Sequence, residues 1–418
     1  MTSVLLFLVL ASLPLSSFFI PLGPAELNPS EILLTLLFVT IIARSVLIAG
    51  PIRVPRKLRS LASCAAALAL AAMVSGIMSG NLTTAIRLGA SVLFALLTAI
   101  ACYRFGPALW TKPVLIGVAL AISIAFGHLV GWVPLMEFER VSGGVATSGI
   151  LQTGYTGLVH ARGEYGILLL LGMASAMIGL RGKWRWLFVL AVLFAGLITV
   201  SRSTWIALAT TSLVMAVLIW LPGKTLSGRL KALALYLTAI AVFVAPAAYF
   251  GLFTWLQERF TLLVGLRASS FDNRIEQFSY FFTHSDGYFW FGGGNTQFLQ
   301  TFGYAIHNTQ MSVFLAFGIL PALFYCVLFL GAIWQTLKMA ARSRDTRAQR
   351  QASVLLAVMC GCFIEASLYP KSSSMIMWAL IGIAWGHTAY LRRGTRQPYM
   401  ASVVAHEQIP SLPQRSFS

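Results

Sequence analysis

Apolar runs of about twenty residues follow one another along most of this 418-residue chain. A helix needs about 20 mainly apolar residues to span a bilayer, and such runs extend from residue 3 to residue 391. We expect spans at about 3–20, 30–50, 60–79, 83–103, 113–133, 163–180, 184–200, 203–221, 231–250, 308–335, 352–367 and 374–391. The pattern predicts an all-α fold, a polytopic membrane helix bundle with about 12 transmembrane helices.

The composition excludes a soluble globular fold. Only 10% of the residues are charged and 58% are hydrophobic, whereas a soluble chain is about a quarter charged. We expect one integral-membrane domain, residues 1–391, and a disordered cytoplasmic tail, residues 392–418, which contains three prolines. The first apolar run lacks a basic n-region, so we interpret it as a span and not as a cleaved signal.

The placement of the basic residues predicts the orientation. The net charge is +18, and 21 of the 30 lysines and arginines lie in alternate connections or the C-terminal tail, in clusters such as Arg53–Arg59, Arg181–Arg185 and Lys338–Arg350. Cytoplasmic loops carry such an excess. The charge therefore indicates membrane topology and not nucleic-acid binding. We expect a multi-pass protein of the cell inner membrane with both termini in the cytoplasm.

Two connections on the predicted periplasmic side are long, residues 134–162 and residues 251–307. The second is the periplasmic loop between the ninth and tenth spans. Long loops in compact domains usually carry function. We therefore expect any chemistry at the periplasmic face.

Arg202 lies in the segment Ser201-Arg202-Ser203-Thr204-Trp205, where the eighth span begins. The start of a helix offers free backbone N–H groups and the positive end of the helix dipole. Arginine can grip a phosphate with two parallel hydrogen bonds. The segment predicts a phosphate or pyrophosphate site, and the structural alternative is an interfacial arginine that extends toward lipid headgroups.

His307 precedes Asn308 and Thr309 at the start of the tenth span, in the same predicted orientation. A helix N-terminus disfavours the imidazolium, which leaves a neutral imidazole that can accept a proton. The structural alternative is that Asn308 or Thr309 merely caps the helix. Both interpretations stay open at this point.

Other charged residues are weaker candidates. Arg267 and Arg274 lie in the long loop, where each by itself is typical of a solvated surface charge. Glu365 lies near the outer end of an apolar span and Arg87 lies one turn into the fourth span. Charged residues inside spans mark functional sites or pair with a partner, which for Glu365 would be Lys371.

The sequence predicts no metal and no cofactor. Glu137 and Glu139 have the spacing of metal ligands, but no histidine or third acid is near them. No nucleotide-binding fingerprint or hydrolase motif is present. The glycines of Gly292-Gly293-Gly294-Asn295 fit either a close approach to a ligand or a turn.

Four features occur in a fixed order. They are Ser201-Arg202-x-x-Trp205, the long loop after the ninth span, Arg274 followed by an aromatic stretch and Phe291-Gly292-Gly293-Gly294-Asn295, and His307-Asn308 with Gly318 eleven residues after His307. Together they resemble the O-antigen ligase and O-antigen polymerase superfamily of bacterial integral-membrane glycosyltransferases. The resemblance covers about residues 150–335 in motif and the whole chain in topology.

The resemblance implies a function in lipopolysaccharide or exopolysaccharide biosynthesis. Members of the superfamily transfer a glycan from undecaprenyl pyrophosphate, without a metal, to lipid A–core (ligases) or to another lipid-linked glycan (polymerases). Carried over by position, Arg202 and Arg274 would hold the pyrophosphate and His307 would help activate the acceptor hydroxyl. Trp205, Arg267 and Asn308 are further candidates for the site, as are Glu365 and Arg87.

The chain departs from the family pattern on the acceptor side. Gly154 and Gly163 stand where many relatives have an arginine and an asparagine, and Arg162 is a candidate to replace one of them. Ala316 and Phe317 precede Gly318 where an acid is frequent. We favour a ligase slightly over a polymerase. The rival from another class is a lipid-linked-sugar flippase or transporter, although the two halves of the chain do not match as a major-facilitator transporter requires.

Overall fold

The structure is a computed structural model of the whole chain. It describes residues 2–17, 20–22, 25–44, 54–133, 157–159, 162–199, 201–220, 276–277, 279–302, 306, 308–343, 345–368 and 374–394. The longer helices among them are α1 Thr2–Ser12, α2 Pro29–Arg44, α3 Arg59–Met78, α4 Leu82–Phe105, α5 Ala108–Leu129, α7 Arg162–Gly179, α8 Gly182–Ile198, α9 Arg202–Met215, α13 Gly294–Phe302, α14 Thr309–Phe317, α15 Ile319–Arg342, α16 Thr346–Leu368 and α17 Met375–Gly394.

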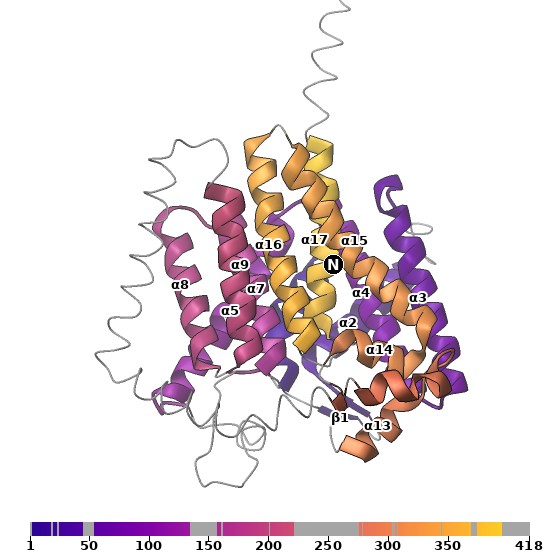
Figure 1. Cartoon of the computed structure of the whole chain (residues 1–418). Coiled ribbons are helices and arrows are strands. Elements are labelled where there is room, and N and C mark those ends of the chain that lie inside the picture. The colour runs from indigo at the N-terminus through magenta and orange to yellow at the C-terminus, as the bar shows by residue number, and fades with distance from the viewer. Residues whose placement is uncertain are drawn as a thin grey trace, which may run out of the picture.

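Short elements connect or extend these helices. Three are 3-10 turns, η1 Leu13–Ser17, η3 Arg56–Leu58 and η5 Ser285–Tyr288, and one is a π-turn, η4 Ala216–Trp220. One antiparallel hairpin, which the sequence does not predict, pairs β1 Ile20–Leu22 with β2 Ala25–Leu27. The described fold is otherwise helical (Figure 1).

Several helices have the length and the apolar composition of membrane spans. Five helical segments are long and apolar enough to cross one: Arg56–Met78, Leu82–Phe105, Ala108–Leu129, Ile319–Arg342 and Thr346–Ser367. Large apolar side chains are exposed along their outer faces, for example Leu70 and Ile77 on α3 and Leu323 and Val327 on α15. Such faces are costly in water and favourable in lipid. The prediction of a helical fold with helices that could cross a membrane is confirmed, and the number of crossings stays a prediction.

Each expected span except one coincides with a described helix. The exception, 231–250, lies outside the described residues, as do residues 134–156, 251–275 and the tail from residue 395. The expected span 308–335 is wrong in its continuity. Gly318 has φ +82° and separates α14 from α15. Only glycine fits at this break, because a Cβ there would lie 2.3 Å from the carbonyl oxygen of Trp290.

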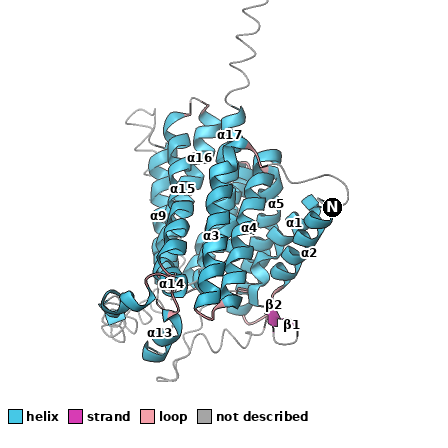
Figure 2. Ribbon diagram, turned by 90° about the vertical axis from the view of Figure 1, so that its right-hand side faces the viewer, coloured by secondary structure: helices cyan, strands magenta, loops and turns pink. Residues whose placement is uncertain are grey.

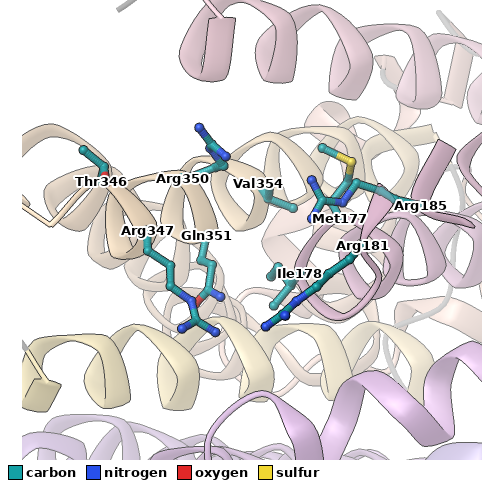
Figure 3. Close-up of a pocket in the computed structure, with 9 residues that line it drawn as sticks. All are labelled: Met177, Ile178, Arg181, Arg185, Thr346, Arg347, Arg350, Gln351 and Val354. Carbon is teal, nitrogen blue, oxygen red and sulfur yellow. The ribbon is translucent and has the colours of Figure 1, made fainter. Parts of the chain in front are cut away.

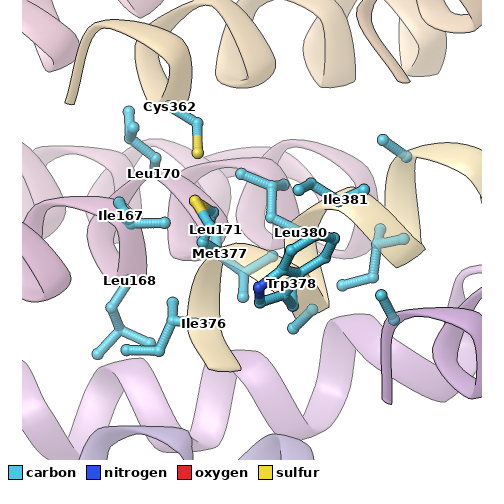
Figure 4. Packing of buried hydrophobic residues seen from close by; sticks show 14 of the residues in the cluster. Ile167, Leu168, Leu170, Leu171, Cys362, Ile376, Met377, Trp378, Leu380 and Ile381 are labelled. Carbon is cyan, nitrogen blue, oxygen red and sulfur yellow. The ribbon is translucent and has the colours of Figure 1, made fainter. Parts of the chain in front are cut away.

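Helix α7 lies at the centre of the bundle. Its apolar residues from Ile167 to Ala176 are buried on every side, as is usual for a helix without a polar face. Figure 4 shows Leu168 and Leu170 of this helix in one apolar cluster with Cys362 of α16 and with Ile376 and Met377 of α17. Helices α16 and α17 therefore share one core with α7.

Glycines bring α17 against α4. A Cβ at Gly382 would lie 2.3 Å from the carbonyl oxygen of Ala95, and one at Gly386 would lie 2.2 Å from that of Ala99. The spacing of four residues places both glycines on one helix face, and small residues at this spacing let two helix backbones approach closely in membranes.

The two ends of the bundle differ in chemistry (Figures 1 and 2). At one end, which we call the hairpin end, lie β1, β2, α13 and the first turn of α14. At the other, the arginine end, α17 finishes, and the Arg392 guanidinium there hydrogen-bonds Gln335 near the end of α15. Tyr390 also contacts Gly106 at the end of α4. The basic turns that the sequence places on one side of the membrane thus lie together.

Candidate active site

Helix α9 begins at the hairpin end with a serine cap. The side chain of Ser201 accepts a hydrogen bond from the backbone N–H of Thr204 at 3.5 Å, as N-cap serines do. Arg202 is therefore the first residue of the helix, as predicted. Its side chain lies outside the part that the structure describes. The remaining first-turn N–H groups and the helix dipole favour an anion at this position.

Glu365 of α16 is joined to this first turn. Its carboxyl group is fully buried, and Oε1 accepts hydrogen bonds from the hydroxyls of Ser203, at 2.8 Å, and Thr204, at 3.4 Å. Because the Ser203 proton points to Glu365, the Ser201 hydroxyl, 3.0 Å away, must donate to Ser203. A directed chain of hydrogen bonds therefore runs from the helix cap to a buried acid.

Helix α7 completes the surroundings of Glu365. A Cβ at Gly166 would lie 2.6 Å from the Thr204 hydroxyl and 3.1 Å from Cδ of Glu365, so only a glycine lets α7 approach this closely. Two residues before it, Glu164 is also buried, with 5% of its surface exposed. The Glu365 atom Oε2 has no hydrogen-bond partner among the described residues. Three helices thus bring two buried acids to one end of the bundle.

Helix α14 begins beside the last turn of α16. Asn308 is its N-cap: Oδ1 accepts from the backbone N–H of Met311 at 2.9 Å, and Nδ2 donates to the carbonyl oxygen of Ser367 at 3.2 Å. The starts of α9 and α14 are therefore each hydrogen-bonded to the last turns of α16, α9 at Glu365 and α14 at Ser367. His307 lies outside the described residues, between buried Ile306 and this cap.

The glycine segment makes its close approach to the protein itself. Gly292 has φ +69°, and a Cβ on it would lie 2.3 Å from the backbone nitrogen of Phe317. The carbonyl of Phe289 accepts from the N–H of Ile319 at 2.8 Å. The segment therefore locks against the break between α14 and α15. The predicted turn is observed, and the close approach to a ligand stays a prediction.

The other predicted residues are placed as follows. The indole N–H of Trp205 donates to the carbonyl of Gly196 at 2.9 Å, which ties α9 to α8. Arg162 is the first residue of α7, and Arg87 is an exposed residue of α4. Arg267 and Arg274 lie outside the described residues, as does Lys371, the predicted partner of Glu365.

Residue Glu164 and the hydroxyls of Ser203 and Thr204 are additions to the predicted site. The sequence signal for Glu164 is its place in the first turn of an apolar helix. The hydroxyls of Ser203 and Thr204 have no local sequence signal, because their partner, Glu365, is 161 or more residues away. Among the described residues, no three His, Cys, Asp or Glu side chains lie close enough together to hold a metal ion.

No protein-family model matches the sequence, and no curated protein matches it significantly.

Proposed function

We propose that the protein is a membrane glycosyltransferase that transfers an undecaprenyl-pyrophosphate-linked glycan to an acceptor, in the manner of an O-antigen ligase. The observation that carries the proposal is that two helix starts, α9 after Ser201 and α14 at Asn308, are both hydrogen-bonded to the end of α16. One start carries Arg202 and the other directly follows His307. A base and an anion-binding arginine at the same end of a bundle are what transfer from a pyrophosphate needs.

The mechanism assigns one role to each helix start. Arg202, at the start of α9, would bind the pyrophosphate and neutralise the charge that grows on it as the glycosidic C–O bond breaks. Arg274 would add a second guanidinium from the long loop. Neutral His307 would accept the proton of the acceptor hydroxyl as its oxygen attacks the sugar carbon. The bond between the glycan and pyrophosphate breaks as the new glycosidic bond forms, so the donor carries its own leaving group and no nucleotide is consumed.

The proposal includes the topology. Twelve crossings with the arginine end in the cytoplasm would leave the hairpin end, Arg202 and His307 at the periplasmic face of the inner membrane. The donor, a lipid A–core or lipid-linked acceptor, and the surrounding membrane lipids are then the partners. Support comes from the separation of charge along the bundle: Arg392 and Arg347 lie at one end, and the starts of α9 and α14 at the other.

Deletion of the gene in the source bacterium tests the activity. We expect loss of all long glycan chains from an intact lipid A–core on gels, together with accumulation of lipid-linked polymer. Core that carries a single repeat unit would instead identify a polymerase of the same chemistry. Lipid-linked units retained in the cytoplasmic leaflet would identify a flippase and overturn the proposal.

Purified protein supplies the direct assay. In nanodiscs, transfer of glycan from undecaprenyl pyrophosphate to lipid A–core, with release of undecaprenyl pyrophosphate, is the expected result. Absence of transfer to either lipid A–core or a second lipid-linked unit would contradict the proposed reaction.

A further inference from the structure

A pocket of about 220 Å³ opens at the arginine end, far from the candidate active site. Four arginines line it: Arg181 and Arg185 from the start of α8, and Arg347 and Arg350 from the start of α16 (Figure 3). Arg181 is the N-cap of α8 and Arg185 lies in its first turn, whereas Arg347 and Arg350 both lie in the first turns of α16. Two helices thus present two arginines each to a single hollow.

These arginines are close enough to repel one another. All four guanidinium groups line one pocket of about 220 Å³, and like charges so near one another repel. Arg185 is also held in place, because its Nε and Nη2 atoms donate to the carbonyl of Leu180 at 3.0 and 2.8 Å. Its charge therefore stays at the pocket and does not move away into solvent.

No carboxylate among the described residues compensates the four charges. Asp345 is the nearest acid in sequence to Arg347, and its Oδ1 atom accepts from the backbone N–H of Arg347 at 2.8 Å, as a cap of α16. The described interactions of the four arginines include no ion pair with an acid. An anion from outside the chain is what would neutralise this set.

Gln351 also lines the pocket, and hydrogen bonds to residues outside the pocket orient its side-chain amide. The indole N–H of Trp110 can only donate, so Nδ1 of His387, 3.5 Å away, must accept. The Nε2–H group of His387 then donates to Oε1 of Gln351 at 3.1 Å. The amide NH₂ of Gln351 is left without a hydrogen-bond partner among the described residues, so the wall of this pocket offers a further N–H donor.

We propose that this pocket binds a phosphate-bearing anion, either the headgroup of an anionic lipid or a soluble phosphate compound. Arginine guanidinium and amide N–H groups are the donors that phosphate oxygens accept from. The volume is smaller than the roughly 300–1,000 Å³ of pockets for drug-sized ligands, so it suits a headgroup or one or two phosphates. Basic pockets between helices are known to hold such headgroups. The inference does not depend on the proposed glycosyltransferase activity.

The test compares two double variants of the full chain. Arg347→Gln/Arg350→Gln removes half of the guanidinium groups from the pocket. Arg342→Gln/Arg393→Gln removes two exposed arginines of the same end that do not line it. Native mass spectrometry of protein titrated with phosphatidylglycerol or cardiolipin, and thermal unfolding with inorganic phosphate or pyrophosphate, measure the two sources of anion. Phosphatidylcholine is the neutral reference.

We expect the pocket variant to bind the anionic probe about tenfold more weakly or worse, and the control variant to bind it as the native chain does. Binding of the lipids only identifies a headgroup site, and binding of phosphate or pyrophosphate identifies a soluble ligand. Without added anion, the pocket variant should unfold at the same or a higher temperature than the native protein, since two repelling charges are gone. An equal loss of anion binding in both variants overturns the proposal, as does a native chain that binds neither the anionic lipids nor phosphate or pyrophosphate.

Discussion

The hairpin end and the arginine end use polar groups in opposite ways. At the hairpin end, hydroxyl, amide and carboxyl groups bind one another: Ser203 binds Glu365, and Asn308 binds both its own helix and Ser367. At the arginine end, the lining groups of the pocket are donors that face a hollow. Polar groups that bind one another hold helix starts rigidly, whereas donors that face a hollow can bind a ligand. Rigid support is what the proposed pair of Arg202 and His307 would require.

The largest expected effect follows from replacing the base. His307→Ala should lower turnover by a factor of about 10²–10⁴, the usual contribution of a positioned general base, while binding of the lipid-linked donor is retained. The measurement is transfer and donor binding by purified protein in nanodiscs. His284→Ala is the matched control, because His284 is an exposed histidine that stacks on Tyr280 outside the proposed site.

Loss of donor binding together with turnover in His307→Ala would remove the proposed base role. The residue would then act on the donor or on folding, and the capping network at Asn308 would account for the whole helix start.

Arg202→Lys should be the next most harmful change. Lysine keeps the charge but loses the planar fork that grips a phosphate with two bonds, so we expect turnover to fall by about a hundredfold at normal expression. Arg342→Lys, at the opposite end, is the control and should leave turnover unchanged. Near-native turnover of Arg202→Lys would return this residue to the structural alternative, an arginine that extends to lipid headgroups.

Which features the sequence could predict depends on how far apart the interacting residues lie. Apolar length predicts helices well, because each helix satisfies its own backbone. The apolar run does not predict the break at Gly318, since Phe317 and Ile319 continue it. The contact that requires glycine at the break is with the carbonyl of Trp290, which is distant in sequence. The hairpin at Ile20–Leu22 is too short to show a strand pattern.

The two sites show the same limit. Arg202 and Asn308 could be placed at helix starts because capping is local. That the end of α16 joins those starts, and that Arg181 lines one pocket with Arg350, depends on how distant helices pack. In the sequence, the charges of the arginines that line this pocket indicate only membrane topology, and no local pattern shows that they converge.

Gly292→Ala tests how rigidly the hairpin end is locked. The new methyl group would meet the backbone of Phe317 at a positive φ, so we expect the free energy of unfolding to fall by about 2 kcal/mol. Gly287→Ala is the matched control, because nothing lies within 4 Å of its Cβ position. Thermal unfolding in detergent gives both values. Equal melting temperatures for the two variants would mean that the glycine segment does not hold the break between α14 and α15.

The smallest effects are expected at Glu365, where two substitutions distinguish the role of its hydrogen bonds from the role of its charge. Glu365→Leu leaves the Ser203 and Thr204 hydroxyls without their acceptor, which should destabilise the protein by about 1–3 kcal/mol. Glu365→Gln keeps an oxygen at the Oε1 position and should unfold within about 1 kcal/mol of the native protein. Under the scaffold interpretation it should also retain most of its turnover. If Glu365→Gln folds normally but loses turnover as His307→Ala does, the carboxylate charge itself serves the reaction, and the polar network at the hairpin end is part of the reacting machinery and not only its support.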